Sequence, residues 1–338
     1  MTTLLHDHFL CFKRDFPSAN SIIVHGQQPL LIDTGFLTDQ DRTEQFLKDA
    51  GIQPTQLQCV INTHAHSDHV GGNHWLQSTF GVPIATHAWS AHAINRRAKD
   101  ACSAEWLDQP VSAYHINKIL HEGDEISTGA VRLTVLHTPA HTLDHIALYD
   151  RDSQTLIAGD VLQEGDIGWL NPFHEGISTL DRAIEVLERL ATLPLRAVFG
   201  GHGGIITKPD ESIRESIRRY SSWFQHPEKM AWHAMKRIFA YALLIRNGMK
   251  ETLVYEYLQN TLWLRDYSTH VFRASTSDLA EEVVKEILRS GGAEWRVDPE
   301  YPQERTLYAT VRYNACEQAE LSCLFAPTVL PPFLPQHW

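Results

Sequence analysis

Cysteine is scarce in this sequence and forms no recognisable pattern. The five cysteines are odd in number, lie far apart and include no Cys-x-x-Cys pair (Cys11, Cys59, Cys102, Cys316, Cys323). This usage argues against a disulfide framework and against a cysteine-built zinc site, and it favours reduced thiols in a reducing compartment. Histidine, by contrast, is plentiful, with 20 residues of which several are grouped.

Long apolar runs are also missing. No stretch approaches the roughly 18 uninterrupted apolar residues that indicate a membrane span. The start of the chain lacks the basic region, apolar core and small-residue cleavage site of a secretory signal. We therefore expect a cytoplasmic protein with no membrane partner.

Concentrated positive charge is absent as well. The formal net charge is −12, and residues 1–209 hold 14 basic against 24 acidic groups, with 15 against 17 in the remainder. Binding to nucleic acid relies on basic clusters that neutralise phosphates. Nucleic acid is thus disfavoured, and a small-molecule substrate is expected.

The first 205 residues alternate short apolar strands with helical stretches. Residues 21–24 and 29–32 form an expected hairpin, a strand is expected at 58–62, and an amphipathic helix at 180–190 leads into a strand at 197–199. Many short strands separated by helices are typical of a layered α/β domain with helices covering sheets. We assign residues 1–208 to this domain.

The pattern changes after Thr207. Helices are expected at 211–224, 228–246, 251–262 and 277–290, followed by a hairpin of 295–297 and 306–311. This order suggests a smaller, mostly helical, winged-helix-like domain over residues 209–320. Its near-neutral charge favours a packing or capping role over DNA binding. The apolar, proline-rich tail at 321–338 suggests contact with a surface or a second copy, as in a homodimer.

One segment carries most of the chemistry. Thr63-His64-Ala65-His66-Ser67-Asp68-His69 places four metal-competent side chains within six residues, directly after an apolar strand. In a strand these side chains would point to opposite faces, whereas in a loop leaving the strand they can converge. Imidazole and carboxylate are ligands that zinc and similar ions prefer.

Three further candidates each follow an expected strand and a turn with Gly or Pro. They are His141, Asp160 in Ala-Gly-Asp, and His202 in Gly-Gly-His-Gly-Gly. Functional groups commonly lie on loops held by a rigid sheet. The repetition of strand, sharp turn and ligand predicts one shared metal site.

The motif His-x-His-x-Asp-His, followed by a His, an Asp and a His, resembles the metallo-β-lactamase superfamily. The resemblance spans roughly residues 20–205 and includes Ile32-Asp33-Thr34-Gly35. It implies an αββα sandwich of two sheets with helices outside. Asp160 at the position of a cysteine ligand resembles the glyoxalase II, lactonase and ribonuclease Z side. The helical C-terminal part is similar to β-lactamase-like protein 2 relatives.

The resemblance also implies a ligand set and a mechanism. His64, His66 and His141 would hold one divalent ion, Asp68, His69 and His202 a second, and Asp160 would bridge them. Zinc is expected, with manganese or iron as alternatives. Asp33 and His145 would orient the ligands from behind. A hydroxide between the ions would attack the substrate, and Asp68 would pass a proton to the leaving group.

Substrate contacts are expected beside the ligands. The segment 166–176 offers an apolar wall of Trp169, Leu170, Phe173 and His174, and residues 89–114 offer Trp106 and Tyr114. We predict hydrolysis of a small thioester, ester or lactone. The alternatives are a metal-dependent ribonuclease or phosphodiesterase, a persulfide dioxygenase with one iron, and a non-enzymatic metal sensor.

Overall fold

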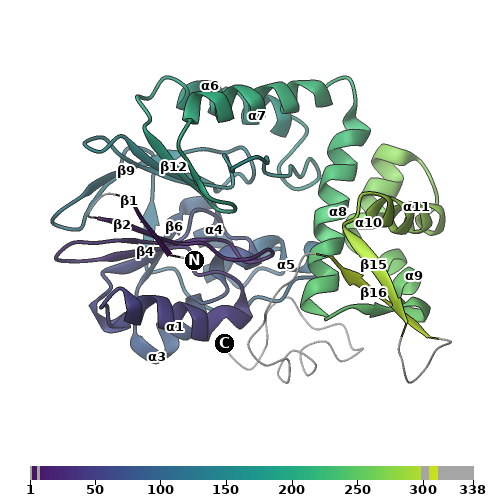
Figure 1. Ribbon diagram of the computed structural model, residues 1–338, viewed down its shortest axis with the longest axis horizontal. Helices are drawn as coiled ribbons and strands as arrows, with labels where there is room; N and C mark the ends of the chain where they lie inside the picture. Colours follow the sequence, from purple (N-terminus) through teal and green to yellow (C-terminus); the bar gives the residue numbers. More distant parts are fainter. Residues whose placement is uncertain (1, 6–7, 298–303, 311–338) are drawn as a thin grey trace.

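A computed structural model describes residues 2–5, 8–297 and 304–310 of the chain (Figure 1). In the described residues, a seven-stranded sheet runs in the order β1 to β7. Strands β3, β4, β5 and β6 form its centre, and β4, β5, β6 and β7 are mutually parallel neighbours. The bounds are β1 Thr2–Leu5, β2 Phe9–Phe12, β3 Ser21–Val24, β4 Leu30–Ile32, β5 Cys59–Ile61, β6 Ile84–His87 and β7 Lys118–Leu120.

The second sheet has the order β13-β12-β11-β10-β9-β8. Its strands pair antiparallel except β11 and β12, which are parallel. The bounds are β8 Glu125–Ser127, β9 Arg132–His137, β10 Ile146–Asp150, β11 Thr155–Gly159, β12 Ala197–Gly200 and β13 Ile205–Ile206.

The two sheets pack face to face and helices cover their outer faces (Figure 1). The core between the sheets joins side chains of both, for example Ile22 and Ile61 with Leu133 and Phe199. Separate apolar clusters lie under the helices outside each sheet. These helices are α1 Gln40–Asp49, α2 Ser67–Val70, α3 Asn73–Phe80, α4 Ala88–Asn95 and α5 Ala104–Leu107 for the first sheet, and α6 Thr179–Leu190 and α7 Pro209–Trp223 for the second. The predicted αββα sandwich is confirmed.

The C-terminal part is mostly helical and has its own apolar core. Its long first helix, α8 Pro227–Ile245, stands along one side of the sandwich, between the sheets and the remaining C-terminal elements (Figure 1). A three-stranded sheet has the order β14-β16-β15. The other bounds are β14 Met249–Lys250, α9 Glu251–Asn260, α10 Leu262–Tyr267, α11 Thr276–Arg289, β15 Ala293–Val297 and β16 Arg305–Ala309, with a π-helix at Ser268–Phe272.

Helix α7 belongs to the sandwich by its packing. Its side chains Ile213, Tyr220 and Trp223 lie in the same apolar cluster as the inner face of α6. The apolar cluster of the C-terminal part contains residues of α8 and later elements, together with Trp106 and Leu107 of α5. The tail at 321–338, from which a homodimer was expected, lies outside the described residues.

Most expected elements are present within one or two residues, but several short ones were not predicted. The strand-like and helical patterns at 58–62, 180–190 and 197–199 correspond to β5, α6 and β12. The expected helix at 251–262 is broken at Thr261, whose extended backbone separates α9 from α10. Residues 67–70, expected as loop, form the one-turn helix α2. Such short elements carry too few residues for a periodic signal.

Candidate metal centre

The predicted ligands all lie just beyond strand ends at one edge of the sandwich. His64 follows β5, Asp160 follows β11 and His202 follows β12, and Asp33, which was expected behind the ligands, follows β4. Because β4 and β5 are parallel, as are β11 and β12, their carboxyl ends open on the same side. Helix α2 then carries Asp68 and His69 back over the strand ends. Sheet topology thus collects residues that lie up to 138 positions apart.

Three histidine nitrogens converge on one side of this edge. His66 Nδ1 lies 3.1 Å from His64 Nε2 and 2.9 Å from His141 Nε2. The other ring nitrogen of His141 donates its proton to the carbonyl oxygen of Trp169 at 2.6 Å. The His141 Nε2 lone pair is therefore directed at the other two rings. All three rings are buried.

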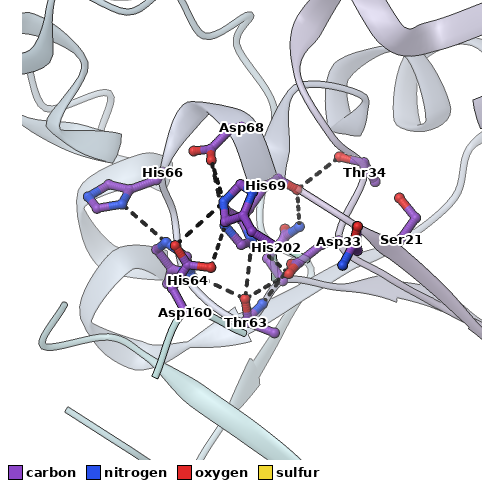
Figure 2. Close-up of polar contacts among 12 residues, drawn as sticks. Ser21, Asp33, Thr34, Thr63, His64, His66, Asp68, His69, Asp160 and His202 are labelled. Carbon is purple, nitrogen blue, oxygen red and sulfur yellow. Dashed lines mark hydrogen bonds and ion pairs between the residues drawn. The ribbon is translucent and has the colours of Figure 1, made fainter. Parts of the chain in front are cut away.

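A second group forms beside the first (Figure 2). His202 Nε2 lies 3.2 Å from Asp68 Oδ2, and His69 Nε2 lies 3.8 Å from the same oxygen. Asp160 stands between the groups, because its carboxylate oxygens lie 3.4 Å from His69, 3.6 Å from His202 and 3.7 Å from His141. The structure thus brings together all seven residues predicted as ligands.

Asp33 contacts this group from behind, as expected. Its Oδ2 accepts hydrogen bonds from His69 Nδ1 and from the Thr63 hydroxyl, each at 2.7 Å (Figure 2). Its Oδ1 accepts a hydrogen bond from the Thr63 backbone N–H at 2.9 Å. Asp33 is buried and has φ of 55°, a backbone conformation that Asp adopts more readily than most residues. These contacts leave His69 Nε2 as the ring atom that faces Asp160.

His145 supports the centre through the backbone rather than as a ligand. Its Nε2 accepts the Asp160 backbone N–H at 3.1 Å, and its Nδ1 lies 2.7 Å from the Thr138 hydroxyl. Backbone also approaches the centre closely at Gly201. A Cβ there would lie 2.1 Å from Asp160 Oδ1 and 2.8 Å from His69 Cε1. Only glycine fits at this position.

Burial and neighbouring charges shift the pKa values of the ionisable groups in this site in opposite directions. Burial lowers the pKa of His66 to about 3, assisted by His141, and burial also holds the pKa of His64 well below its ordinary value. Burial alone would lower the pKa of His69 too, but Asp33 and Asp160 raise it well above the usual range.

The residues fit divalent cations. His69 Nε2 and Asp160 Oδ1 are buried and accept or donate no hydrogen bond among the described residues. Three sets of ligand atoms each lie within 4.8 Å of one another: His64, His66 and His141; His64, His69 and Asp160; and Asp68, His69 and His202. These two atoms lie 3.4 Å apart as an ion pair without a hydrogen bond, and imidazole and carboxylate are donors suited to zinc-like ions.

A cavity of about 400 Å³ opens beside these groups. His66, Asp68, Asp160 and His202 line its floor. The walls come from four distant parts of the chain: residues 13–16, Leu107 and Gln109 at the end of α5, residues 163–169 after Asp160, and helix α8, which supplies Arg237, Ile238 and Tyr241. The C-terminal part therefore completes the cavity.

Only Trp169 of the four expected substrate residues lines this cavity. Its ring stacks on His66, with centroids 5.3 Å apart and planes 7° apart. Leu170 is fully buried in the cluster under α6, and Phe173 and His174 pack against Trp106, because successive side chains of this segment point in different directions. Trp106 and Tyr114 also lie in apolar clusters rather than in the cavity lining.

Sequence reasoning missed the cavity residues outside the motifs. Among them are Phe16, Leu107, Gln109, Ile238 and Tyr241. None lies in a pattern that distinguishes it from ordinary core residues, since the position of α8 beside the sandwich is a tertiary property. No sequence signal would have identified them.

These features define a metal-dependent hydrolase, and the chain belongs to the metallo-beta-lactamase superfamily, whose family model matches residues 14–202. The probable metallo-hydrolase YqgX of Bacillus subtilis is 30% identical over 199 residues, which cover 56% of this chain and 88% of that protein. The acyl-coenzyme A thioesterase MBLAC2 of Homo sapiens is 28% identical over 237 residues, covering 64% and 78%. The resemblance stated from the sequence is confirmed.

Solved structures show the same fold. A metallo-beta-lactamase family protein from Thermus thermophilus matches with a TM-score of 0.58 at 19% identity, covering 90% of this chain and 100% of that protein. Separately, no helix among the described residues combines the length and the apolar character that crossing a bilayer demands.

Proposed function

We propose that this protein is a hydrolase with two divalent metal ions, zinc in the first instance, that cleaves a small thioester, ester or lactone. The observation that carries the proposal is the pair of ligand groups joined by Asp160, with buried atoms of His69 and Asp160 that lack hydrogen-bond partners. His64, His66 and His141 would hold one ion and Asp68, His69 and His202 the other. Asp160 would contact both.

Bound ions would lower the pKa of a shared water and polarise the substrate carbonyl. The protein groups would do the rest. Asp68, on the cavity floor, would orient the attacking water and carry its proton to the departing sulfur or oxygen. Water and thioester would thus yield a carboxylic acid and a thiol. Trp169, stacked on His66, would limit the position of the acyl group.

The cavity favours a small and partly apolar substrate. Lys13, Arg14 and Arg237 are accompanied by Asp15, Glu164 and Asp166, so the cavity lining offers no excess of basic groups for a polyanion. The similarity to an acyl-coenzyme A thioesterase supports a thioester as the first class to test. Two complete ligand groups support a dinuclear centre over the single iron of a dioxygenase.

The first experiment is metal content by plasma mass spectrometry on protein purified without added metal, followed by hydrolysis assays. The panel contains thioesters, lactones and a phosphodiester. We expect about two zinc, manganese or iron ions per chain and thioester hydrolysis that a chelator abolishes and zinc restores. In Asp160→Ala the metal content should fall to one ion or fewer.

A matched control is Asp150→Ala. Asp150 is also a buried aspartate beside a strand of the second sheet, but its carboxylate binds Ser153 in a turn away from the centre. This variant should keep both ions. One iron per chain, or full activity in Asp160→Ala, would contradict the proposed dinuclear hydrolase.

A further inference from the structure

The lining of the cavity includes both exposed charged side chains and buried side chains. Of the lining residues, Lys13, Asp15 and Glu164 are exposed, whereas Leu107, Gln109, Ile238 and Tyr241 are at most 6% exposed. A polar leaving group is better solvated beside the exposed side chains, and a short acyl group is better placed against the buried ones. Selection among acyl groups would then depend on the buried side chains.

One polar side chain stands out among the buried ones. Gln109 is 6% exposed, and its Oε1 accepts the hydroxyl proton of Ser67 at 2.7 Å. Its Nε2 amide makes no hydrogen bond with any described residue, although it carries two donors. Because Gln109 lines the cavity, these donors are available to a ligand there. A buried amide without partners is costly unless a ligand or water satisfies it.

The orientation of the Gln109 amide is held by a chain of hydrogen bonds. The Tyr241 hydroxyl of α8 lies 2.7 Å from Ser67 Oγ. Since the single Ser67 proton goes to Gln109 Oε1, the Tyr241 hydroxyl is the donor to Ser67. The Oε1 atom of the Gln109 amide thus has a partner, whereas its Nε2 donors have none among the described residues. Ser67 precedes Asp68 directly, so this chain lies next to the predicted catalytic residue.

We propose that Gln109 is a specificity-determining residue that donates a hydrogen bond to an oxygen atom of the substrate's acyl group, with Ser67 and Tyr241 as positioning residues. This inference rests on the proposed hydrolase function. It narrows the substrate to short acyl groups that carry an ether, hydroxyl or carbonyl oxygen near the scissile carbonyl. Purely aliphatic acyl groups would leave the amide donors unpaired and are disfavoured.

The test compares two thioesters of N-acetylcysteamine. Methoxyacetyl and butanoyl groups have equal numbers of heavy atoms and differ by one oxygen in place of a methylene. The measured quantity is the ratio of kcat/KM for the two substrates. The comparison of this ratio between variants cancels the difference in intrinsic reactivity of the two thioesters.

In Gln109→Leu the ratio should fall about three- to tenfold, as expected for loss of one neutral hydrogen bond. Gln109→Glu keeps the acceptor for Ser67 but replaces the donors by an oxygen, so it should lower the ratio at least as much. Tyr241→Phe should lower it less, because Ser67 still engages the amide. Melting temperatures identify variants that fail to fold.

Gln163→Leu is the matched control, because Gln163 also lines the cavity and is 7% exposed, but no hydrogen bond from the described part of the chain fixes its amide. The ratio should stay within about twofold of wild type. An equal fall for both thioesters in Gln109→Leu, or a loss of the preference in Gln163→Leu instead, would overturn the assignment to Gln109. An unchanged ratio in Tyr241→Phe would overturn its positioning role.

A binding experiment separates this inference from the proposed function. Calorimetry measures the affinity of zinc-treated protein for methoxyacetate and butanoate, the two acid products. If wild type hydrolyses no thioester, ester or lactone of the panel, these two thioesters included, the proposed function fails. A preference for methoxyacetate that is present in wild type and lost in Gln109→Leu would still support the Gln109 site, and no preference in wild type would refute it.

Discussion

Asp33→Asn isolates the contribution of a residue that supports the metal centre without being one of the seven ligands. Asn is isosteric with Asp and also tolerates the φ of 55° at this position, so the backbone needs no change. The amide keeps one oxygen for the Thr63 backbone N–H but presents an NH₂ group where Oδ2 accepted protons from His69 and the Thr63 hydroxyl. Two donors then face each other.

The size of the expected fall in zinc affinity follows from the hydrogen bond that His69 loses in Asp33→Asn. To avoid the clash, His69 must move its proton from Nδ1 to Nε2, the atom that lies 3.4 Å from Asp160. A hydrogen bond to a charged group contributes about 1.5–3 kcal/mol, which corresponds to roughly 10- to 100-fold in affinity. Loss of groups that orient a ligand typically weakens metal binding by a similar factor.

The assay is a competition titration of metal-free protein with zinc against a chromophoric chelator. We expect the affinity of one zinc ion, held with His69, to fall about 10- to 100-fold in Asp33→Asn, with the other ion much less affected. Asp150→Asn is the control, because Asp150 is another buried carboxylate that accepts hydrogen bonds from a neighbouring turn. Wild-type affinity for both ions in Asp33→Asn would refute the reasoning.

Three further predictions concern the surroundings of the centre. Gly201→Ala should reduce zinc content below one ion per chain, because its Cβ would overlap Asp160 Oδ1, as measured by mass spectrometry. Tyr220→Phe should destabilise the protein by about 1 kcal/mol in denaturant unfolding, since its hydroxyl donates to the Gly168 carbonyl at 2.8 Å. Burial, with a smaller contribution from the charge of Asp144, raises the pKa of Glu175 from 4.5 to about 7, so folding favours its protonated form. Stability present below pH 4.5 should therefore be lost as pH rises to 7, by up to about 3 kcal/mol, and Glu175→Gln should remove this loss.

Each of these three predictions would be contradicted by a particular result. Normal zinc content in Gly201→Ala would mean that the backbone at this position can move away from Asp160. Unchanged unfolding in Tyr220→Phe would show that water replaces the hydrogen bond to Gly168. A wild-type pH profile in Glu175→Gln, measured by urea unfolding between pH 5 and 8, would assign the pH dependence to other groups.

Local sequence patterns were sufficient to predict many of the strands and helices of this protein and its candidate metal ligands. The ligands from His64 to His69 stand within six residues of one another, and each later candidate follows an apolar strand and a turn. Strand periodicity and Gly or Pro punctuation are properties of short segments, so β3, β5, β12 and α6 could be predicted with nearly correct bounds. The αββα sandwich and the division of the ligands between two ions were implied by the resemblance to the metallo-β-lactamase superfamily, which rests on motifs at strand ends.

The substrate cavity was decided only by the tertiary structure. Whether Leu170 points to the cavity or to the core depends on how the segment after Asp160 packs against α6 and α7, and periodicity carries no such information. The wall of the cavity comes from α8, whose Tyr241 reaches Ser67 across 174 positions of sequence. Such contacts form because the apolar face of a helix must be buried against the sandwich. The amino-acid sequence shows which face of the helix is apolar, but not which surface of the protein that face packs against.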